Sequence, residues 1–267
     1  MKNWIIALDL HGTLLNVEWK ISQDNQKILA KLIDELTEYA DFYICTGNDY
    51  SFVKEFVPQA LLNKMTGCVL ETGCIVKTDD NEINYINEEL QTQILELKEY
   101  LKSKDYSFVK YFAERRSTIS IFTQDSKSGE NPVNFYNQIN EDILRHPLSE
   151  RVYLTWSSVA LDIIPKGYSK WETLKMLAED KQIISFMDSY NDKEIAKNSY
   201  LTYLPKNASD KLISYLRSEN KLVFPLNKFH PTVNQVFISE KPFSEGVIEG
   251  LTVLKTITER NLNAKKK

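Results

Sequence analysis

The chain has 267 residues, 42% of them hydrophobic and 26% charged, with a formal net charge of -4 at pH 7. That composition is ordinary for a folded globular protein, and the length allows one large domain or two smaller ones. The acidic balance argues against a general nucleic-acid-binding protein, and no apolar run has the length of a membrane span or the layout of a signal peptide. We therefore expect no nucleic-acid partner, no membrane partner and a cytoplasmic location. The oligomeric state is open, and a monomer is compatible with the sequence.

The first part of the chain alternates predicted strands and helices. The apolar run Trp4 to Leu8 indicates a short buried strand, which is followed by Asp9 and then by the loop residues Gly12 and Thr13. Ser22 is placed to cap a helix with apolar residues at helical spacing, namely Ile28, Leu29, Leu32, Ile33 and Leu36. A strand over 41–45, a helix over 52–62 and a strand over 68–70 follow. This alternation predicts an α/β fold with a parallel sheet and right-handed crossovers. The strand-like segments also hold Cys45, Cys68 and Cys74, which we expect to be buried reduced thiols.

The middle of the chain, roughly residues 82 to 162, has a different pattern. Asn87 can start a helix, residues 118–123 alternate like a strand with one exposed face, and residues 132–144 are again helical. Two further strands, over 152–158 and 160–164, meet near Ser157 and Ser158. We expect this block, 82–162, to be an inserted α+β domain, with 1–81 and 163–267 together forming the other domain.

The last part returns to the first pattern. A capping box from Ser169 to Glu172 opens a helix that begins with Lys170, and a strand over 183–186 ends at Met187 and Asp188. Four polar elements thus stand at strand ends or helix starts: Asp9, the loop Thr46-Gly47-Asn48, Lys170, and the run from Asp188 through Asn191 to Asp192. Because a parallel sheet gathers the carboxyl ends of its strands at one edge, we expect these elements to converge.

Such a set suits phosphoryl transfer. A carboxylate can attack phosphorus, while a hydroxyl, loop amides and an ammonium group hold the phosphoryl oxygens. A second group of carboxylates can hold Mg²⁺ beside the anionic nucleophile and substrate. For the lysine, Lys166 is the alternative to Lys170. Asp188 and Asp192 also have an alternative interpretation, as a solvated acidic turn before a helix.

The order of these elements resembles the four motifs of the haloacid dehalogenase-like (HAD) phosphohydrolases. Residues 9–13, Asp-Leu-His-Gly-Thr, resemble the first motif, Asp-x-Asp-Gly-Thr. Residues 71–74 resemble the Glu-Asn-Gly-Ala turn of the Cof-type subgroup, and residues 162–170 resemble its segment leading to the motif lysine. The resemblance covers nearly the whole chain, and it implies a Rossmann-like parallel-sheet HAD core with an inserted C2-type cap domain.

The resemblance also implies roles for individual residues. Asp9 is expected to be the nucleophile that forms an aspartyl-phosphate, and His11 takes the general acid/base position. The expected phosphate-binding residues are Gly12, Thr13, Thr46, Gly47, Asn48 and Lys170. The expected Mg²⁺ site consists of Asp9, the backbone carbonyl of His11, and Asp188, supported by Asn191 and Asp192. Arg115 and Arg116 of the cap are expected to cover and select a small phosphorylated metabolite such as a sugar phosphate.

Two residues depart from the family pattern. His11 replaces the second aspartate of the first motif, and Met187 replaces the glycine before Asp188. Imidazole has an unperturbed pKa of ~6.5 and can exchange protons near neutral pH, so a Mg²⁺-dependent phosphatase is the first hypothesis. A pseudophosphatase that binds a phosphorylated ligand or partner is the second. The third is an enzyme whose chemistry stops at the aspartyl-phosphate.

Overall fold

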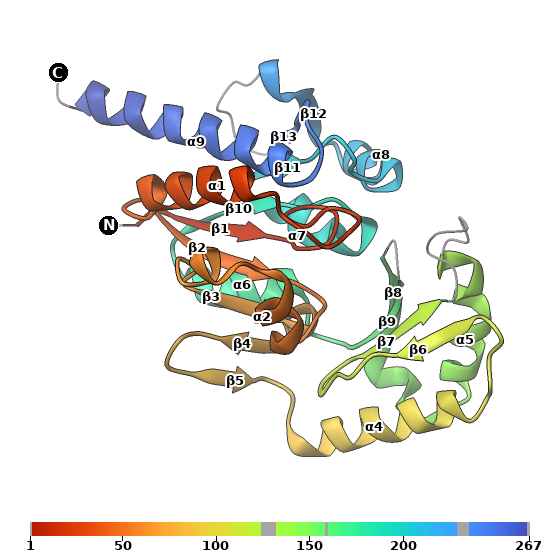
Figure 1. The fold of residues 1–267 in the computed structure, drawn as a ribbon. Helices are drawn as coiled ribbons and strands as arrows, with labels where there is room; N and C mark the ends of the chain where they lie inside the picture. Colours follow the sequence, from red (N-terminus) through yellow and green to blue (C-terminus); the bar gives the residue numbers. More distant parts are fainter. Residues whose placement is uncertain (1, 124–131, 158–159, 229–234, 266–267) are drawn as a thin grey trace.

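The computed structural model describes residues 2–123, 132–157, 160–228 and 235–265, whose strands form two sheets (Figure 1). The larger sheet has nine strands in the order β12-β13-β11-β10-β1-β2-β3-β4-β5. Its pairs are parallel from β12 to β3, and only the last two pairs, β3 with β4 and β4 with β5, are antiparallel. The strands are β1 (Trp4–Leu8), β2 (Ala40–Cys45), β3 (Gly67–Leu70), β4 (Ile75–Lys77), β5 (Glu82–Asn84), β10 (Gln182–Phe186), β11 (Leu201–Leu204), β12 (Leu222–Pro225) and β13 (Gln235–Ile238). The predicted α/β fold is confirmed.

Helices cover both faces of the larger sheet. Along β1, Ile6 and Leu8 pack in one apolar cluster with α1 (Gln23–Leu36) and α9 (Phe243–Lys265). Ile5 and Ala7 pack in a second cluster, with α6 (Lys170–Ala178), α7 (Lys193–Asn198) and α8 (Asp210–Ser218). Successive strand residues point to opposite faces, so one apolar run supplies both layers. Among the described residues, no helix is long and apolar enough to cross a membrane.

The helices after β1 and β2 refine the sequence prediction. Ser22 caps α1 as expected, with its hydroxyl accepting a hydrogen bond from the backbone N–H of Asn25 at 3.2 Å. Of the five apolar residues at helical spacing, Leu29, Leu32, Ile33 and Leu36 are buried, and Ile28 lies beside them and is 45% exposed. The helix expected over 52–62 is two helices, α2 (Tyr50–Phe56) and α3 (Gln59–Leu62). Pro58 separates them because proline lacks an N–H and forces Val57 into an extended conformation.

The smaller sheet is antiparallel, in the order β6-β7-β9-β8. Its elements are β6 (Val109–Phe112), β7 (Ile119–Thr123), β8 (Val152–Trp156) and β9 (Ala160–Pro165), with α4 (Glu88–Lys102), α5 (Tyr136–Leu144) and the short 3₁₀ turns η2 (Pro132–Phe135) and η3 (Pro147–Arg151). The expectation of a strand with an exposed face over 118–123 is wrong: β7 is buried except for the half-buried Phe122. Helices pack on one face of this strand, and the other face is turned toward the larger sheet (Figure 1).

The chain leaves the larger sheet after β5 and returns to it after β9. Because β5 pairs with β4 and β9 ends at Pro165, the smaller sheet and its helices occupy the chain between Asn84 and Pro165. The domain limits 82 and 162 stay a prediction. The expected meeting point of β8 and β9 near Ser157 and Ser158 lies partly outside the described residues.

A strained turn links the larger sheet to the start of α6. The 3₁₀ turn η1 (Glu71–Gly73) follows β3 and has positive φ at each of its residues, 45°, 57° and 102°. The hydroxyl of Thr173 donates to the carbonyl of Gly73 at 2.6 Å. A Cβ at Gly73 would lie 2.2 Å from the carbonyl oxygen of Ser169. The turn therefore fixes where α6, and with it Lys170, begins.

We expect Gly73→Ala to destabilise the protein by about 3 kcal/mol or more, because a left-handed conformation and a backbone clash act together. Gly167→Ala is the matched control, since Gly167 also has positive φ (90°) but nothing lies within 4 Å of its Cβ position. It should lose only about 1 kcal/mol. Urea unfolding of both variants measures the difference, and equal losses would refute the packing argument.

Candidate active site

Three strand ends bring the predicted residues to one edge of the larger sheet. Leu8 is paired with Ile44 of β2 and with Phe186 of β10, so these strands end side by side. Asp9 therefore lies between the loop after β2, which begins with Thr46, and the loop after β10, which holds Asp188. The structure thus brings these elements together, as expected from the parallel pairing of the strands.

Lys170, the first residue of α6, joins two of the carboxylates. Its Nζ lies 2.6 Å from Asp9 Oδ1 and 2.7 Å from Asp192 Oδ1, and its side chain is only 4% exposed. Burial works against the charged form, but the negative charges of Asp192 and Asp9 outweigh it and raise the pKa of Lys170 above its ordinary value. The lysine is therefore a permanent cation. The alternative, Lys166, is exposed and faces Glu150 at 3.9 Å instead.

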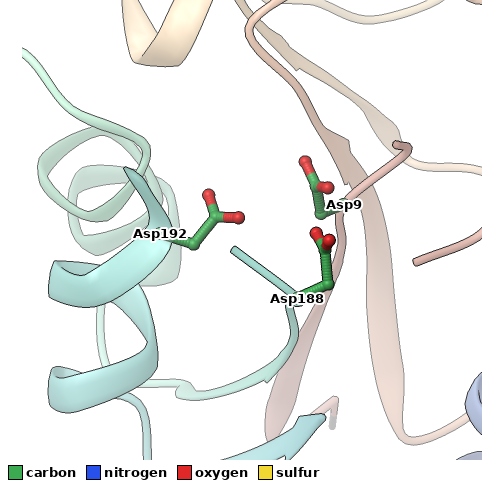
Figure 2. Close-up of side chains that lie close together, drawn as sticks. All are labelled: Asp9, Asp188 and Asp192. Carbon is green, nitrogen blue, oxygen red and sulfur yellow. The ribbon is translucent and has the colours of Figure 1, made fainter. Parts of the chain in front are cut away.

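Asp9, Asp188 and Asp192 form a carboxylate cluster (Figure 2). Each offers an oxygen, and these atoms lie within 4.8 Å of one another. Burial raises the pKa of Asp188, and the neighbouring charges of Asp9 and Asp192 raise it further. Burial likewise raises the pKa of Asp192 to about 6, although Lys170 opposes the shift. One lysine does not neutralise the cluster, so it attracts further positive charge.

The cluster fits a small divalent cation. Within the described part of the chain, Asp192 Oδ2 is buried and has no hydrogen-bond partner. The Asp188 carboxylate lies against Gly12, where a Cβ would stand 2.0 Å from Asp188 Oδ2. Thr13 donates to the other oxygen of Asp188 at 3.4 Å. An all-oxygen donor set of this kind suits Mg²⁺.

His11 is held next to the cluster by the loop after β2. The side-chain amide of Asn48 donates to Thr46 Oγ1 at 3.1 Å and lies 3.2 Å from His11 Nδ1. The Asn48 oxygen accepts from Arg115 at 2.5 Å. Because a guanidinium only donates, this contact fixes the amide orientation, so His11 Nδ1 is an acceptor and its hydrogen is on Nε2.

The surroundings of His11 keep it neutral. Its ring packs against Trp19 and Phe52, with centroids 5.5 Å and 4.8 Å away. Burial, together with the positive charges of Lys170 and Arg115, lowers the pKa of His11 from 6.5 to about 4. At neutral pH the imidazole is therefore uncharged.

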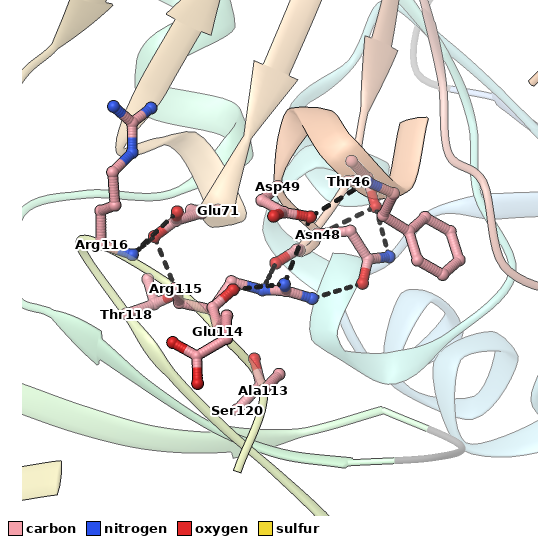
Figure 3. Close-up of polar contacts among 12 residues, drawn as sticks. Thr46, Asn48, Asp49, Glu71, Ala113, Glu114, Arg115, Arg116, Thr118 and Ser120 are labelled. Atoms are coloured by element: carbon pink, nitrogen blue, oxygen red, sulfur yellow. Dashed lines mark hydrogen bonds and ion pairs between the residues drawn. The ribbon is translucent and has the colours of Figure 1, made fainter. Parts of the chain in front are cut away.

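Arg115 and Arg116 point in different directions (Figure 3). Arg115 reaches from the segment between β6 and β7 to the loop after β2, where its Nε donates to the Gly47 carbonyl at 3.2 Å and its Nη1 lies 3.4 Å from Asp49. The Arg116 guanidinium pairs with Glu82 at 2.6 Å, and its side chain is 56% exposed. Of the two predicted arginines, the structure brings only Arg115 to the site.

Glu71 ties the same segment of the smaller sheet to the turn η1. Its carboxylate is fully buried and accepts hydrogen bonds from the backbone N–H groups of Arg116, at 3.0 Å, and Ser117, at 2.7 Å. Figure 3 shows this contact beside the Arg115 network. Glu71 of the turn η1 and Arg115 of the segment between β6 and β7 thus connect the smaller sheet to loops of the larger one.

In the described part of the chain, two hollows border Lys170, and the smaller of them also borders Asp9. The smaller, of about 40 Å³, is bordered by Asp9, His11, Thr46, Asn48 and Arg115, and also by Ser120 and Asp162 of the smaller sheet. The larger, of about 630 Å³, shares Lys170 and Asn191 with it and is lined by the aromatic residues Tyr136, Tyr153, Trp156, Tyr168, Trp171 and Tyr190.

Sequence reasoning missed Ser120 and Asp162 as site residues. Ser120 Oγ donates to Asp162 Oδ1 at 2.6 Å, and burial raises the pKa of Asp162. The two are paired across β7 and β9, on the face opposite Ile119 and Ile121. The sequence did contain one indication of these residues: β7 and β9 are apolar strands that each hold a polar residue. Because alternate residues of a strand face opposite sides, such a polar residue indicates that the second side of the strand is also buried.

Comparisons with known proteins identify a matching family and similar folds. A family model described as haloacid dehalogenase-like hydrolase matches residues 6–151 and 119–219. Among solved structures, the chain is similar to the sucrose-phosphatase of Synechocystis in complex with sucrose and phosphate, with 14% identity, a TM-score of 0.69, and coverage of 94% of this chain and 98% of that one.

It is also similar to a haloacid dehalogenase-like hydrolase from Bacteroides thetaiotaomicron (14% identity, TM-score 0.60, covering 95% of this chain and 100% of that one). A trehalose-6-phosphate phosphatase related protein gives 14% identity and a TM-score of 0.57, with coverage of 98% and 100%. Among curated proteins, none matches the chain. At these identities the solved structures support the fold alone.

The lowered pKa of His11 predicts how stability depends on pH. The unfolded chain takes up a proton below pH 6.5, whereas folded His11 resists protonation down to about pH 4. The free energy of unfolding therefore decreases as the pH falls from 6.5 toward 4, and the decrease is about 2 kcal/mol between pH 7 and pH 5. His11→Gln lacks this contribution, so urea unfolding should show wild type losing more stability than the variant over the same pH range. Parallel pH curves would contradict the assignment.

Proposed function

Because the chain belongs to the haloacid dehalogenase-like hydrolase family, we propose that it is a Mg²⁺-dependent phosphatase acting on a small phosphorylated metabolite through an aspartyl-phosphate. The observation that carries this proposal is the position of Lys170, which contacts Asp9 and Asp192 inside a buried carboxylate cluster. Burying a lysine and a group of carboxylates costs free energy, and buried charged clusters with shifted pKa values are common at functional sites.

Asp9 would carry the chemistry. Lys170 donates to Asp9 Oδ1, which leaves Oδ2 for attack on phosphorus while the ammonium group neutralises the approaching phosphoryl oxygens. A bond forms between Oδ2 and phosphorus as the bond to the leaving-group oxygen breaks. Water then attacks the aspartyl-phosphate, releasing inorganic phosphate and restoring Asp9. Thr46, its neighbouring loop amides, and Lys170 hold the phosphoryl group.

Asp9, Asp188 and the backbone carbonyl of His11 would hold Mg²⁺, with Asn191 and Asp192 in support. The cation supplies the positive charge that lets an anionic nucleophile and an anionic substrate approach each other.

His11 would exchange the protons of the reaction. It gives a proton to the leaving-group oxygen and takes one from the attacking water. Burial is the largest cause of its lowered pKa, and the charges of Lys170 and Arg115 add to it. An arriving phosphate dianion offsets these two charges and so raises the pKa of the imidazole toward its ordinary value. This coupling supports histidine as a replacement for the aspartate of the family motif.

The large aromatic cavity supports a ring-bearing leaving group of the sugar-phosphate type. Its volume of about 630 Å³ is in the range of small-molecule sites, and it borders Lys170 and Asn191. The smaller sheet, within the cap expected over 82–162, would select the substrate, with Arg115 rather than Arg116 near the phosphoryl group. The three buried free thiols support a reducing compartment such as the cytoplasm.

We expect steady-state phosphate release from a panel of sugar phosphates in the presence of Mg²⁺, and its loss with a chelator. Asp9→Asn should reduce turnover to background because the nucleophile is gone, while Asp24→Asn, which changes an exposed carboxylate on α1, should leave it unchanged. Absence of any Mg²⁺-dependent turnover above Asp9→Asn would reject the phosphatase.

Substitutions of His11 distinguish a histidine that takes part in catalysis from a site whose activity is impaired. If His11 exchanges the protons, both His11→Gln and His11→Asp should lower kcat, the former by about 10²-fold. A carboxylate at position 11 would meet the rings of Trp19 and Phe52, which do not solvate it. A large gain in His11→Asp would instead identify an impaired natural site.

One observation favours a second candidate, a pseudophosphatase that binds a phosphorylated ligand. The Asn48 amide, which is oriented by Arg115, donates a hydrogen bond to His11 Nδ1, and all three residues border the 40 Å³ hollow at Asp9. In that case sugar phosphates raise the melting temperature without turnover. An enzyme that stops at the aspartyl-phosphate would differ from both, because intact-mass measurement after exposure to acetyl phosphate would detect one added phosphoryl group.

A further inference from the structure

An aromatic stack joins the smaller sheet to the loop after β10. The ring of Trp156, the last residue of β8, stacks on Tyr190 with a centroid separation of 5.2 Å and an interplanar angle of 25°. Lys211 of α8 lies over both rings, 4.1 Å from the Trp156 centroid and 4.9 Å from that of Tyr190. Three elements distant in sequence, β8, the loop and α8, therefore meet at this stack.

The stacked tyrosine begins the turn that carries a site carboxylate. The 3₁₀ turn η4 (Tyr190–Asp192) has three residues, and its last, Asp192, is 1% exposed and accepts from Lys170 at 2.7 Å. In so short a turn, a displacement of the Tyr190 ring is transmitted to Asp192. From the larger sheet's own helices, Tyr190 has an edge contact with Tyr215, at 5.9 Å, and contacts with the cations of Lys193, at 4.7 Å, and Lys211, at 4.9 Å. Trp156 supplies the stacked ring on this tyrosine.

We propose that Trp156 is a positioning residue: by stacking on Tyr190 from the smaller sheet, it fixes the turn η4 and thereby places Asp192 for Lys170 and for the metal site. The carboxylate cluster is then completed only when β8 is docked. This inference rests on the proposed function, because it concerns the geometry of the same site.

The competing role for Trp156 is direct contact with substrate, since it also lines the 630 Å³ cavity. The two roles differ in what they change. A substrate platform alters KM and leaves metal binding untouched. A positioning residue alters Mg²⁺ affinity with no substrate present, because supporting groups of a metal site affect affinity by about 10- to 100-fold.

The test compares Trp156→Ala, Trp156→Phe and Lys211→Met in the full-length protein. Mg²⁺ binding is measured by calorimetry without substrate, and kcat and KM are measured separately. Trp156→Ala should weaken Mg²⁺ binding about 10-fold and lower kcat more than it raises KM. Trp156→Phe keeps a ring that can stack on Tyr190, so its Mg²⁺ affinity and its kcat should both be close to those of wild type. Lys211→Met changes an exposed side chain that does not threaten folding, and it should weaken Mg²⁺ binding in the same direction by a smaller factor.

Tyr100→Ala is the matched control. Tyr100 forms a similar cluster with His146, at 5.1 Å, and Lys104, at 4.3 Å, but all three belong to the helical layer of the smaller sheet. Tyr100→Ala should bind Mg²⁺ with the same affinity as wild type.

Unchanged Mg²⁺ affinity in both Trp156→Ala and Lys211→Met, or a loss as large in Tyr100→Ala, overturns the proposal. If neither wild type nor any variant releases phosphate, but their Mg²⁺ affinities follow the expected order, the proposed phosphatase function is wrong and the positioning role of Trp156 is supported. If Trp156→Ala has a normal kcat and only its KM changes, the positioning role of Trp156 is wrong and the phosphatase function is supported.

Discussion

The contact of Lys170 with Asp9 and Asp192 is the constraint on which the rest of the site depends. Charges with exposures of a few per cent are stable inside a protein only when each has a partner in good geometry. The fold meets that requirement by where its elements begin and end: Asp9 follows β1, the turn η4 ends at Asp192, and the α6 helix capped by Ser169 begins at the lysine. Removing any of these leaves an uncompensated buried charge.

The two sheets share in this arrangement. Glu71 and Arg115 hold the segment between β6 and β7 to the loops after β3 and β2, on one side of the hollow at Asp9. The Trp156–Tyr190 stack holds β8 on the other side. The smaller sheet is thus fastened by charge at one margin and by aromatic packing at the other.

Much of the fold followed from local pattern. The strand over 4–8, the cap at Ser22 and the helix start at Lys170 were predictable because apolar periodicity and capping chemistry act over a few residues. Convergence of Asp9, Thr46, Lys170 and Asp188 was predictable because parallel strands end at one edge. The error over residues 118–123 arose because distant parts of the chain decide burial: the face of β7 that was expected to be exposed is turned toward the larger sheet. The exposure of Ile28 likewise depends on where α1 packs, which helical spacing alone does not give.

Side-chain direction was the least predictable level. Arg115 and Arg116 are adjacent and chemically identical, yet one faces the site and the other faces Glu82, because successive backbone positions point to opposite sides. His11 was visible as a substitution, but its neutrality depends on Trp19, Phe52 and Arg115, which come from separate segments. Met187, where a glycine was expected, is fully buried in the core cluster that contains Ile5 and Ala7.

The docked position of Arg115 has a consequence for ligand discrimination. The hollow at Asp9 has a volume of about 40 Å³ and is bordered by Arg115, which also donates to the Gly47 carbonyl of the loop after β2. A ligand that fits this hollow alone makes few contacts. A ligand that also reaches the aromatic cavity, which shares Lys170 and Asn191 with the hollow, makes more contacts. The two adjoining hollows therefore favour ligands long enough to occupy both.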